Sequence, residues 1–498
     1  MTVLSLLIVL PLAASAVLGA LPRTADGVAR VVFAVVAGVE VVLIAGLWLA
    51  VGTPAAGQLA AEERLRWIPG LGVSYHLGVD GLSLPLLALT GVIFAACAVY
   101  DWRETDRPRA RSALFLFLEA TCVGLFAAQD LILFFLFFDL SIVAMYFVIA
   151  GWGHGDKTRS ALKFFLYTFL GSLALLVGFI GLYLAAEPHT FDIPELARAD
   201  VLADNPWAGW VLAAIVVGLV VKTPTVPFHT WLPPAHTDAP ATGSAVLAGV
   251  LLKMGTYGFV RIAMPLLPEA WRAWAPVLIA VGIVSVLYGA LVALAQNNLK
   301  RMIAYTSVNH MGYVVLAVGA AGAAGGADDT VRQTAVVGAV TQMVSHGLIT
   351  GALFLLAGVL ARRTGTYDLT AYGGLAASAP RFAGFFAVAS FASLGLPGFS
   401  GFIAEFQIFA GSIGVVPISA LALLGILITA ALFLRAFQRV FTGPVRGVSA
   451  GFADLRPGEA VPTGGLLVLS VALGLFPAPV LDTIAPAAAD VVTLVLRG

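Results

Sequence analysis

Long runs of apolar residues, separated by short polar segments, follow one another along the whole chain. A helix needs about 20 such residues to cross the hydrocarbon core of a bilayer, whereas a transmembrane barrel would show alternating polarity. The pattern therefore predicts an all-α polytopic membrane protein. Its fourteen expected spans cover residues 2–20, 28–51, 81–100, 112–128, 131–152, 161–186, 207–236, 241–265, 273–296, 302–323, 334–361, 382–411, 413–440 and 461–483.

The composition supports a single membrane domain. Of the 498 residues, 60% are hydrophobic and only 11% are charged, which is too few polar residues to cover a soluble fold of this length. No change of composition divides the chain, so we expect one domain over residues 1–498.

The distribution of Lys and Arg predicts the orientation. An even number of spans puts both termini on one side of the membrane. Alternate loops hold seventeen basic residues and the opposite surface holds seven, and basic loops stay in the cytoplasm. We therefore expect both termini on the outer side of a bacterial inner (plasma) membrane or an equivalent organellar membrane. The basic loops contain Arg23, Arg30, Arg103, Arg107, Arg109, Arg111, Lys157, Arg159, Lys163, Lys300, Arg301, Arg362, Arg363, Arg381, Arg439, Arg446 and Arg456, and the opposite surface contains Arg64, Arg66, Arg198, Arg261, Arg272, Arg332 and Arg497.

Several kinds of site are excluded by the motifs that the sequence lacks. The two cysteines, Cys97 and Cys122, lie in apolar runs, so the chain has no ligand set for an iron–sulfur cluster and no disulfide framework. It contains no phosphate-binding loop or dinucleotide motif, and its charged residues show no metal-ligand spacing. We expect no cofactor in this chain.

Asp139, Lys222 and Lys253 lie inside apolar runs. A charged side chain at the bilayer centre costs roughly 2.5–3.5 kcal/mol, so such residues usually face a partner or a wet cavity. We expect Asp139 to pair with Lys222, because a carboxylate stabilises the protonated form of a lysine. The alternatives are a neutral, hydrogen-bonded Asp139 and lysines that extend to the interface.

Two spans contain helix-breaking residues. Pro224 and Pro227 follow Lys222, and Pro397 stands between two glycines just before Glu405. A proline lacks an N–H group and frees carbonyls about one turn earlier, and broken helices in transporters mark ion sites. Lys222 and Glu405 are therefore candidates for ion-site residues.

His310, His346 and Glu119 complete the candidate proton path. Imidazole titrates near neutral pH and has two distinct nitrogens, so a histidine can pass a proton on. A core histidine bonded to a neighbouring helix is an equally good interpretation, and so is a structural role for Glu119. Arg435 is interpreted as a residue that extends to the interface.

Four segments together resemble the signature of the antiporter-like subunits of respiratory complex I, the proton-pumping NADH:quinone oxidoreductase. They are KTPTVPFHTWLPPAHTDAPATGSAVLAGVLLKMGTYG at 222–258, NLKRMIAYTSVNHMGY at 298–313, QMVSHG at 342–347 and LGLPGFSGFIAEF at 394–406. The resemblance covers essentially the whole chain. Within the family, the motifs HTWLP and LKMGTYG are similar to those of the M type (subunit 4) rather than to those of the N or L type.

The resemblance implies roles for individual residues. Lys222 matches the lysine of the first half-channel, and Lys253 matches the central connecting lysine. His310 and His346 match the linking histidines, and Glu405 matches the acid on the exit side.

The resemblance also implies the architecture. Fourteen helices are expected, with helices four to eight (112–265) and nine to thirteen (273–440) forming inverted repeats, and with helices seven and twelve broken. Glu119 matches a family acid on helix four. Asp139 stands where most relatives have glutamate, and its shorter side chain implies a helix shift or a bridging water between it and Lys222.

The function implied by the resemblance is proton translocation driven by quinone reduction in other subunits. FMN and iron–sulfur clusters are expected in those subunits, L- and N-type chains and the lipid bilayer are the expected partners, and no nucleic acid is involved. The alternatives are a D-type subunit of a multisubunit cation/proton antiporter, a membrane subunit of a related hydrogenase or inorganic-carbon uptake complex, and a purely structural scaffold.

Overall fold

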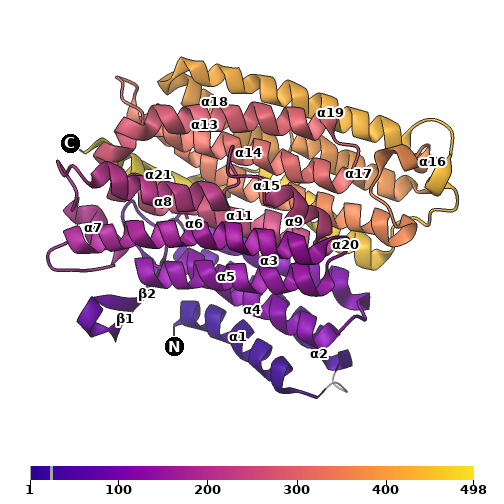
Figure 1. The fold of residues 1–498 in the computed structure, drawn as a ribbon, viewed down its shortest axis with the longest axis horizontal. Coiled ribbons are helices and arrows are strands. Elements are labelled where there is room, and N and C mark those ends of the chain that lie inside the picture. Colours follow the sequence, from indigo (N-terminus) through magenta and orange to yellow (C-terminus); the bar gives the residue numbers. More distant parts are fainter. Residues whose placement is uncertain (1, 23–25, 498) are drawn as a thin grey trace.

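The computed structural model describes residues 2–22 and 26–497 (Figure 1). Arg23, one of the predicted loop arginines, lies outside the described residues. In Figure 1 the long helices lie side by side with their axes roughly aligned. Both termini lie toward the same end of the bundle (Figure 1). We call this the terminal end, and we call the opposite end, formed by loops such as 101–107, 153–156 and 442–456, the basic end.

Helices form wherever the sequence has its long apolar runs. They are α1 (Val3–Ala20), α2 (Asp26–Val51), α3 (Leu84–Tyr100), α4 (Pro108–Ala127), α5 (Leu131–Trp152), α6 (Lys157–Ala185), α7 (Ile193–Ala199), α8 (Ala208–Lys222), α9 (Leu232–Asp238), α10 (Ala241–Val246), α11 (Leu252–Gly258), α12 (Met264–Leu266), α13 (Pro268–Ala295), α14 (Leu299–Ala321), α15 (Asp329–Thr364), α16 (Leu375–Ser378), α17 (Pro380–Ser393), α18 (Ser400–Val415), α19 (Leu423–Phe441), α20 (Pro457–Leu475) and α21 (Ala478–Leu496). Among the described residues, twelve helices are long and apolar enough to cross a membrane, and α8 and α18 are shorter apolar helices. The predicted all-α polytopic membrane fold is confirmed, with close to the expected number of spans.

The last predicted span, 461–483, joins parts of two helices. Because the residue before a proline disfavours helical geometry, α20 ends just before Phe476–Pro477, and α21 starts afresh. Side chains near the ends of three other helices hold α21: Trp48 bonds to Thr483 at 3.3 Å, Gln333 to the Ala485 carbonyl at 2.8 Å, and Arg272 to the Arg497 carbonyl at 2.9 Å. The helix therefore lies across the terminal end instead of passing through the bundle.

The two central helices differ in polarity but are both enclosed. Every residue of α14 except Arg301 is buried, and the middle of α15 is buried throughout. By itself α14 is not apolar enough to count among the twelve membrane-crossing helices. A helix shielded from lipid by its neighbours can carry polar side chains at bilayer depth. The core of the bundle is thus the place where a polar site can lie.

Small residues bring α13 and α14 close together. A Cβ atom added at Gly312 would lie 2.8 Å from the Val286 amide nitrogen, and one added at Gly282 would lie 2.6 Å from the Leu316 amide nitrogen. Both distances are too short for real contacts, so glycine is needed for these backbones to pack.

We expect the Gly312→Val variant to unfold at a clearly lower temperature than the parent protein in detergent. Overpacking a rigid interface costs about 1–3 kcal/mol, and here the obstructing atoms are backbone atoms that cannot turn aside. Gly384→Val is the matched control, because a Cβ atom there meets nothing within 4 Å. Equal unfolding midpoints for the two variants would contradict this account of the interface.

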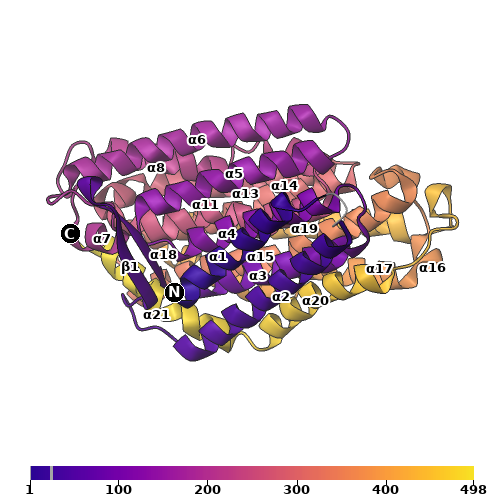
Figure 2. The same cartoon turned by 90° about the horizontal axis from the view of Figure 1, so that it is seen from below.

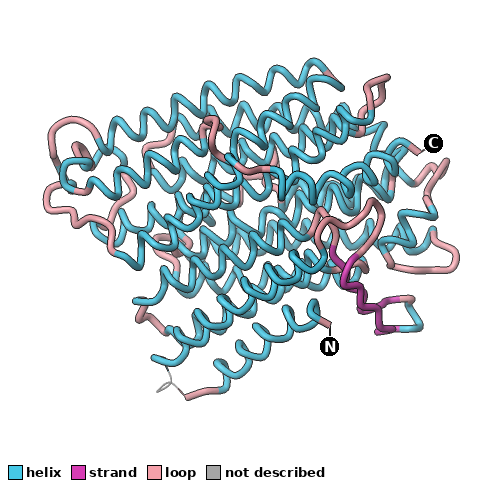
Figure 3. Tube along the Cα trace, turned by 180° about the vertical axis from the view of Figure 1, so that it is seen from behind, coloured by secondary structure: helices cyan, strands magenta, loops and turns pink. Residues whose placement is uncertain are grey.

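A two-stranded antiparallel sheet connects α2 to α3. It consists of β1 (Ala60–Ile68) and β2 (Val73–Val79), with Glu63 opposite Leu77. The hairpin projects from the terminal end of the bundle, near α21 (Figures 2 and 3). It covers part of a cavity described below.

Candidate functional site

Lys253 is fully buried near the centre of the bundle. It lies on α11, between the π-helical turns Leu247–Leu251 and Phe259–Ala263. Its Nζ donates to the Ala248 carbonyl and lies 2.7 Å from His346 Nδ1 on α15. A residue of the first half of the chain thus contacts a histidine of the second half.

The contacts continue from His346 to a buried carboxylate. The His346 ring centroid lies 5.4 Å from that of His310 on α14, and His310 Nδ1 lies 3.6 Å from Glu405 Oε1 on α18. Gln342 Nε2 lies 3.0 Å from the same His310 nitrogen. These four side chains line a cavity of about 10 Å³, which is room for about one water. The structure thus brings together Lys253, both histidines and Glu405.

The second helix interruption makes room for this carboxylate. Helix α17 ends at Ser393 and α18 begins at Ser400, so Pro397 lies in the interruption. Gly395 has φ +68°, and a Cβ atom there would overlap a Glu405 carboxylate oxygen. The backbone of the break therefore forms one wall of the Glu405 site.

The first helix interruption starts directly after Lys222. Helix α8 ends at this residue, and Pro224 and Pro227 lie in the segment before α9. Trp231 Nε1 donates to the Val221 carbonyl at 2.9 Å, which satisfies one of the carbonyls that the break leaves free. Lys222 is thus held at the end of a helix whose backbone remains largely hydrogen-bonded.

Lys222 and Asp139 do not form a direct ion pair in the described part of the chain. Lys222 Nζ instead donates to Ser141 at 3.2 Å and lies 4.7 Å from the centroid of the Phe138 ring. Phe138 and Ser141 share one face of α5 because they are three residues apart. Asp139 lies to the side of that face beside the Ser172 hydroxyl of α6, and its Oδ1 has no hydrogen-bond partner.

Glu119 on α4 does not join the row of contacts. It is completely buried, both carboxylate oxygens lack hydrogen-bond partners, and the same is true of Glu40 on α2, which lies near it. Glu40, like Glu119, is a lone acid in an apolar run, and this is the sequence signal that identifies it as a candidate. Within residues 2–22 and 26–497, no group of three or more His, Cys, Asp or Glu side chains is placed to hold a metal ion.

Lys300, assigned above to a basic loop, is instead completely buried in the first turn of α14. Its Nζ donates to the Ala239 carbonyl and lies 5.3 Å from the centroid of the Tyr367 ring. The prediction was wrong because the helix starts three residues before the expected span, so that its first turn is already enclosed.

His236 is a further buried group that the sequence interpretation did not single out. Its ring stacks on Phe354 at 4.5 Å, and neither ring nitrogen has a hydrogen-bond partner. It is close enough to both Lys300 and Lys253 to be influenced by their charges. The polar groups thus extend from Lys253 toward the basic end.

A cavity of about 440 Å³ opens at the terminal end, and Asp80 and Arg261 line its floor. Arg261 Nη2 lies 2.5 Å from Asp80 Oδ1, and Arg261 Nε donates to Tyr257 Oη at 2.9 Å. Tyr257 and Arg261 are in contact on one side of this helical stretch, and Lys253 lies one turn before Tyr257. Lys253 therefore lies about 12 Å below the floor of this cavity.

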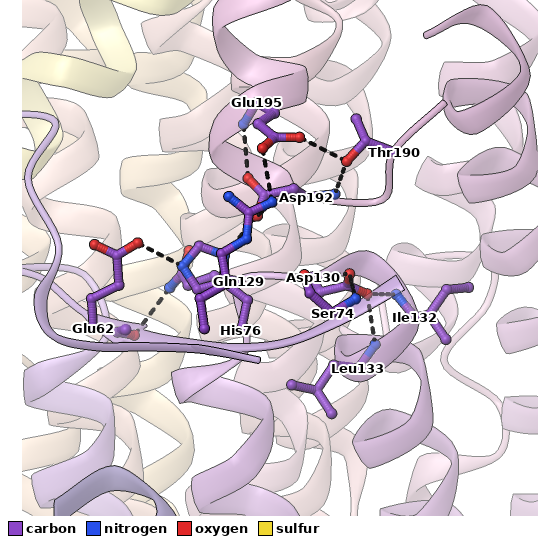
Figure 4. Close-up of polar contacts among 12 residues, drawn as sticks. Glu62, Ser74, His76, Gln129, Asp130, Ile132, Leu133, Thr190, Asp192 and Glu195 are labelled. Carbon is purple, nitrogen blue, oxygen red and sulfur yellow. Dashed lines mark hydrogen bonds and ion pairs between the residues drawn. The ribbon is translucent and has the colours of Figure 1, made fainter. Parts of the chain in front are cut away.

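The hairpin is tied to the wall of the same cavity by a buried histidine (Figure 4). His76 Nδ1 lies 2.6 Å from Asp192 and His76 Nε2 lies 2.9 Å from Glu62, while Arg64 lies 3.2 Å from Asp192. Nearby, Asp130 caps α5, and burial raises the pKa of its carboxyl group against the effect of the amide hydrogen bonds. These contacts fix the shape of the cavity mouth.

Comparisons with known proteins agree with one another. The family described as NADH:quinone oxidoreductase/Mrp antiporter, TM, matches residues 128–432. NADH-quinone oxidoreductase subunit M of Rhodobacter capsulatus is 39% identical over 98% of this chain and 96% of its own length, and NAD(P)H-quinone oxidoreductase chain 4 of Gloeobacter violaceus is 39% identical over 88% and 83%. A chain of respiratory complex I from Thermus thermophilus superposes with TM-score 0.85 at 31% identity, covering 98% of this chain and 99% of that one. A chain of the Mrp complex from a Dietzia species shares the fold at TM-score 0.84 and 22% identity, over 99% of each chain.

Proposed function

Because the chain belongs to the NADH:quinone oxidoreductase/Mrp antiporter membrane family, we propose that it is a proton-translocating, antiporter-like subunit of an NADH:quinone oxidoreductase. Relatives that cover most of the chain are named subunit M or chain 4 of that enzyme. The likeness to the Mrp complex chain, at 22% identity, supports the fold alone. A D-type cation/proton antiporter therefore remains the second choice.

The row of neighbouring side chains from Lys253 to Glu405 carries the proposal. Lys253 contacts His346 Nδ1, while His346 Nε2 has no protein partner. An imidazole that takes a proton at one nitrogen can release one from the other. A water in the adjoining cavity would bridge His346 to Glu405, because ordered water makes hydrogen bonds nearly as good as direct ones. The row is thus suited to passing protons between the two halves of the bundle.

In the proposed mechanism, the first half of the chain delivers protons to the row of side chains from Lys253 to Glu405. A charge buried in a low-dielectric interior acts strongly on its neighbours, so a change at Asp139 alters the tendency of Lys222 to hold a proton. Water would carry the proton on to Lys253, since no side-chain contact joins the two lysines in the described structure. His236 and Lys300 offer a second connection, toward the basic end.

Arg261 blocks proton transfer from Lys253 toward the cavity at the terminal end. Its guanidinium stays charged at all relevant pH values, and it stands between Lys253 and the cavity at the terminal end. Because a guanidinium held by Asp80 neither releases nor accepts a proton, it cannot relay one toward this cavity. Release therefore runs by way of Glu405.

The energy comes from outside the chain in this proposal. Quinone reduction in partner subunits, which would hold FMN and iron–sulfur clusters, drives the charge changes, and L- and N-type chains are the proposed neighbours. The assembly acts as a translocase, and this chain carries no redox centre. The basic end would face the cytoplasm of a bacterium, with both termini outside the inner membrane, and segments 112–265 and 273–440 would be the inverted repeats.

The Lys222→Ala and Glu405→Gln variants test the proposal in the intact complex. We expect both to lower NADH-driven proton pumping in vesicles and the coupled quinone reductase rate, because each removes a proton-carrying group. Glu195→Gln, a half-exposed acid on α7, is the matched control and should pump normally.

Normal pumping stoichiometry in both Lys222→Ala and Glu405→Gln would refute the pathway. Sodium-dependent proton exchange by vesicles without an electron donor would instead favour the D-type antiporter. The two measurements thus distinguish an error in the proposed proton path from an error in the proposed type of subunit.

A further inference from the structure

A cavity of about 600 Å³ lies at the basic end, between α2, α3, α15 and α20. Four arginines line it, Arg103, Arg362, Arg363 and Arg456, against only two acids, Glu104 and Glu459. The lining therefore carries an excess of positive charge. Nothing in the proton pathway uses this cavity.

One of the arginines, Arg362, keeps hydrogen-bond donors free for a ligand. The Arg362 guanidinium lies 4.4 Å from the centroid of the Tyr100 ring, which holds it in place, and its nearest carboxylate contacts, at 3.5 and 3.8 Å, are too long for good hydrogen bonds. Arg363 is held by the protein itself, because its Nη2 donates to Glu459 at 2.6 Å and to the Asp454 carbonyl at 3.1 Å. A phosphate oxygen would accept charge-assisted hydrogen bonds from the free donors of Arg362.

The other wall of the cavity is apolar and leads toward the lipid. Ala34 of α2 and Val99 of α3 line it together with Trp102, which is 48% exposed. The next residue of α2, Val35, is 56% exposed. Tryptophan is enriched at the membrane interface, and exposed apolar side chains below it face acyl chains. The cavity thus joins a cationic pocket to a lipid-facing surface.

We propose that this cavity binds the headgroup of an anionic phospholipid. The phosphate contacts Arg362, and the acyl chains lie along α2 and α3. Basic pockets between transmembrane helices recognise lipid headgroups in this way. Free phosphate shares the headgroup chemistry but has no use for the apolar wall.

The test uses the intact complex in detergent, with phosphatidylglycerol and phosphatidylcholine probes that carry the same photoreactive acyl chain. We expect phosphatidylglycerol to label α2 and α3 near residues 34 and 99 more strongly than phosphatidylcholine does. Arg362→Gln should lower this labelling about tenfold, as expected for one lost charge-assisted hydrogen bond. Arg159→Gln, whose side chain is 86% exposed elsewhere at the basic end, should leave it unchanged.

A second variant tests the proposal independently of whether Arg362→Gln folds. Ala34→Trp narrows the apolar side of the cavity, keeps every arginine and should also lower the labelling. Equal labelling by the two lipids, or full labelling of Ala34→Trp, would overturn the proposal. Displacement of the phosphatidylglycerol probe by excess inorganic phosphate, with phosphate alone raising the unfolding temperature, would show a free-anion site and also overturn it.

Discussion

Replacing Lys253 by methionine will strongly slow proton transfer through this chain. Methionine has a similar length but cannot carry a proton, so the contact with His346 Nδ1 is lost and the two halves of the bundle are disconnected. A lost acid–base group slows a proton-transfer step by about 10²-fold or more. In vesicles containing the intact complex, we expect fewer protons pumped per NADH and a slower coupled quinone reductase.

Lys163→Met on α6 is the matched control, because Lys163 is exposed and lies outside the row. Both variants should assemble, and their unfolding temperatures should be compared first, since Lys253→Met leaves the Ala248 carbonyl without the Nζ donor. A Lys253→Met complex that pumps the parental number of protons per NADH would show that the lysine is only structural.

Replacing Arg261 by methionine will destabilise the protein strongly. The substitution leaves Asp80 buried without its partner, and breaking a buried ion pair from one side costs about 3–5 kcal/mol. The double variant Arg261→Met/Asp80→Asn should recover much of this loss, because the isolated charge is gone. Thermal unfolding in detergent measures both effects.

The same Arg261→Met variant should also let protons leak from vesicles without an electron donor, because the guanidinium that cannot relay a proton is gone and the Asp80 carboxylate, left without its partner, can take one up. Arg66→Met on β1 is the control, since its side chain is exposed. An unchanged unfolding temperature together with an unchanged leak would show that Arg261 neither supports the fold nor closes the path.

The membrane fold follows from apolar runs, and the candidate residues follow from charges within those runs. Lys253 and Glu405 are detectable because few residues of their kind occur at that depth. Their contact through two histidines was implied only by the family resemblance, because it depends on how α11, α14, α15 and α18 are placed around one another. Sequence spacing within one helix contains no such information.

Residues near span ends are the ones that sequence reasoning misplaced. Lys300 stands two residues before the predicted span, and whether such a residue lies in a loop or in a buried first turn depends on neighbouring helices. The partner of Lys222 was missed for a related reason. Asp139 and Ser141 are two residues apart on α5, and a small rotation of that helix decides which one meets the lysine.

The polarity of α14 also affects how the chain is inserted into the membrane. A helix with His310, Asn309 and Ser307 in its middle partitions weakly into lipid when it leaves the ribosome. The strongly apolar α13 is made first and packs tightly against it through glycines, so it can hold α14 in the bilayer until α15 arrives. Insertion of the central helix α14 therefore depends on its neighbours α13 and α15.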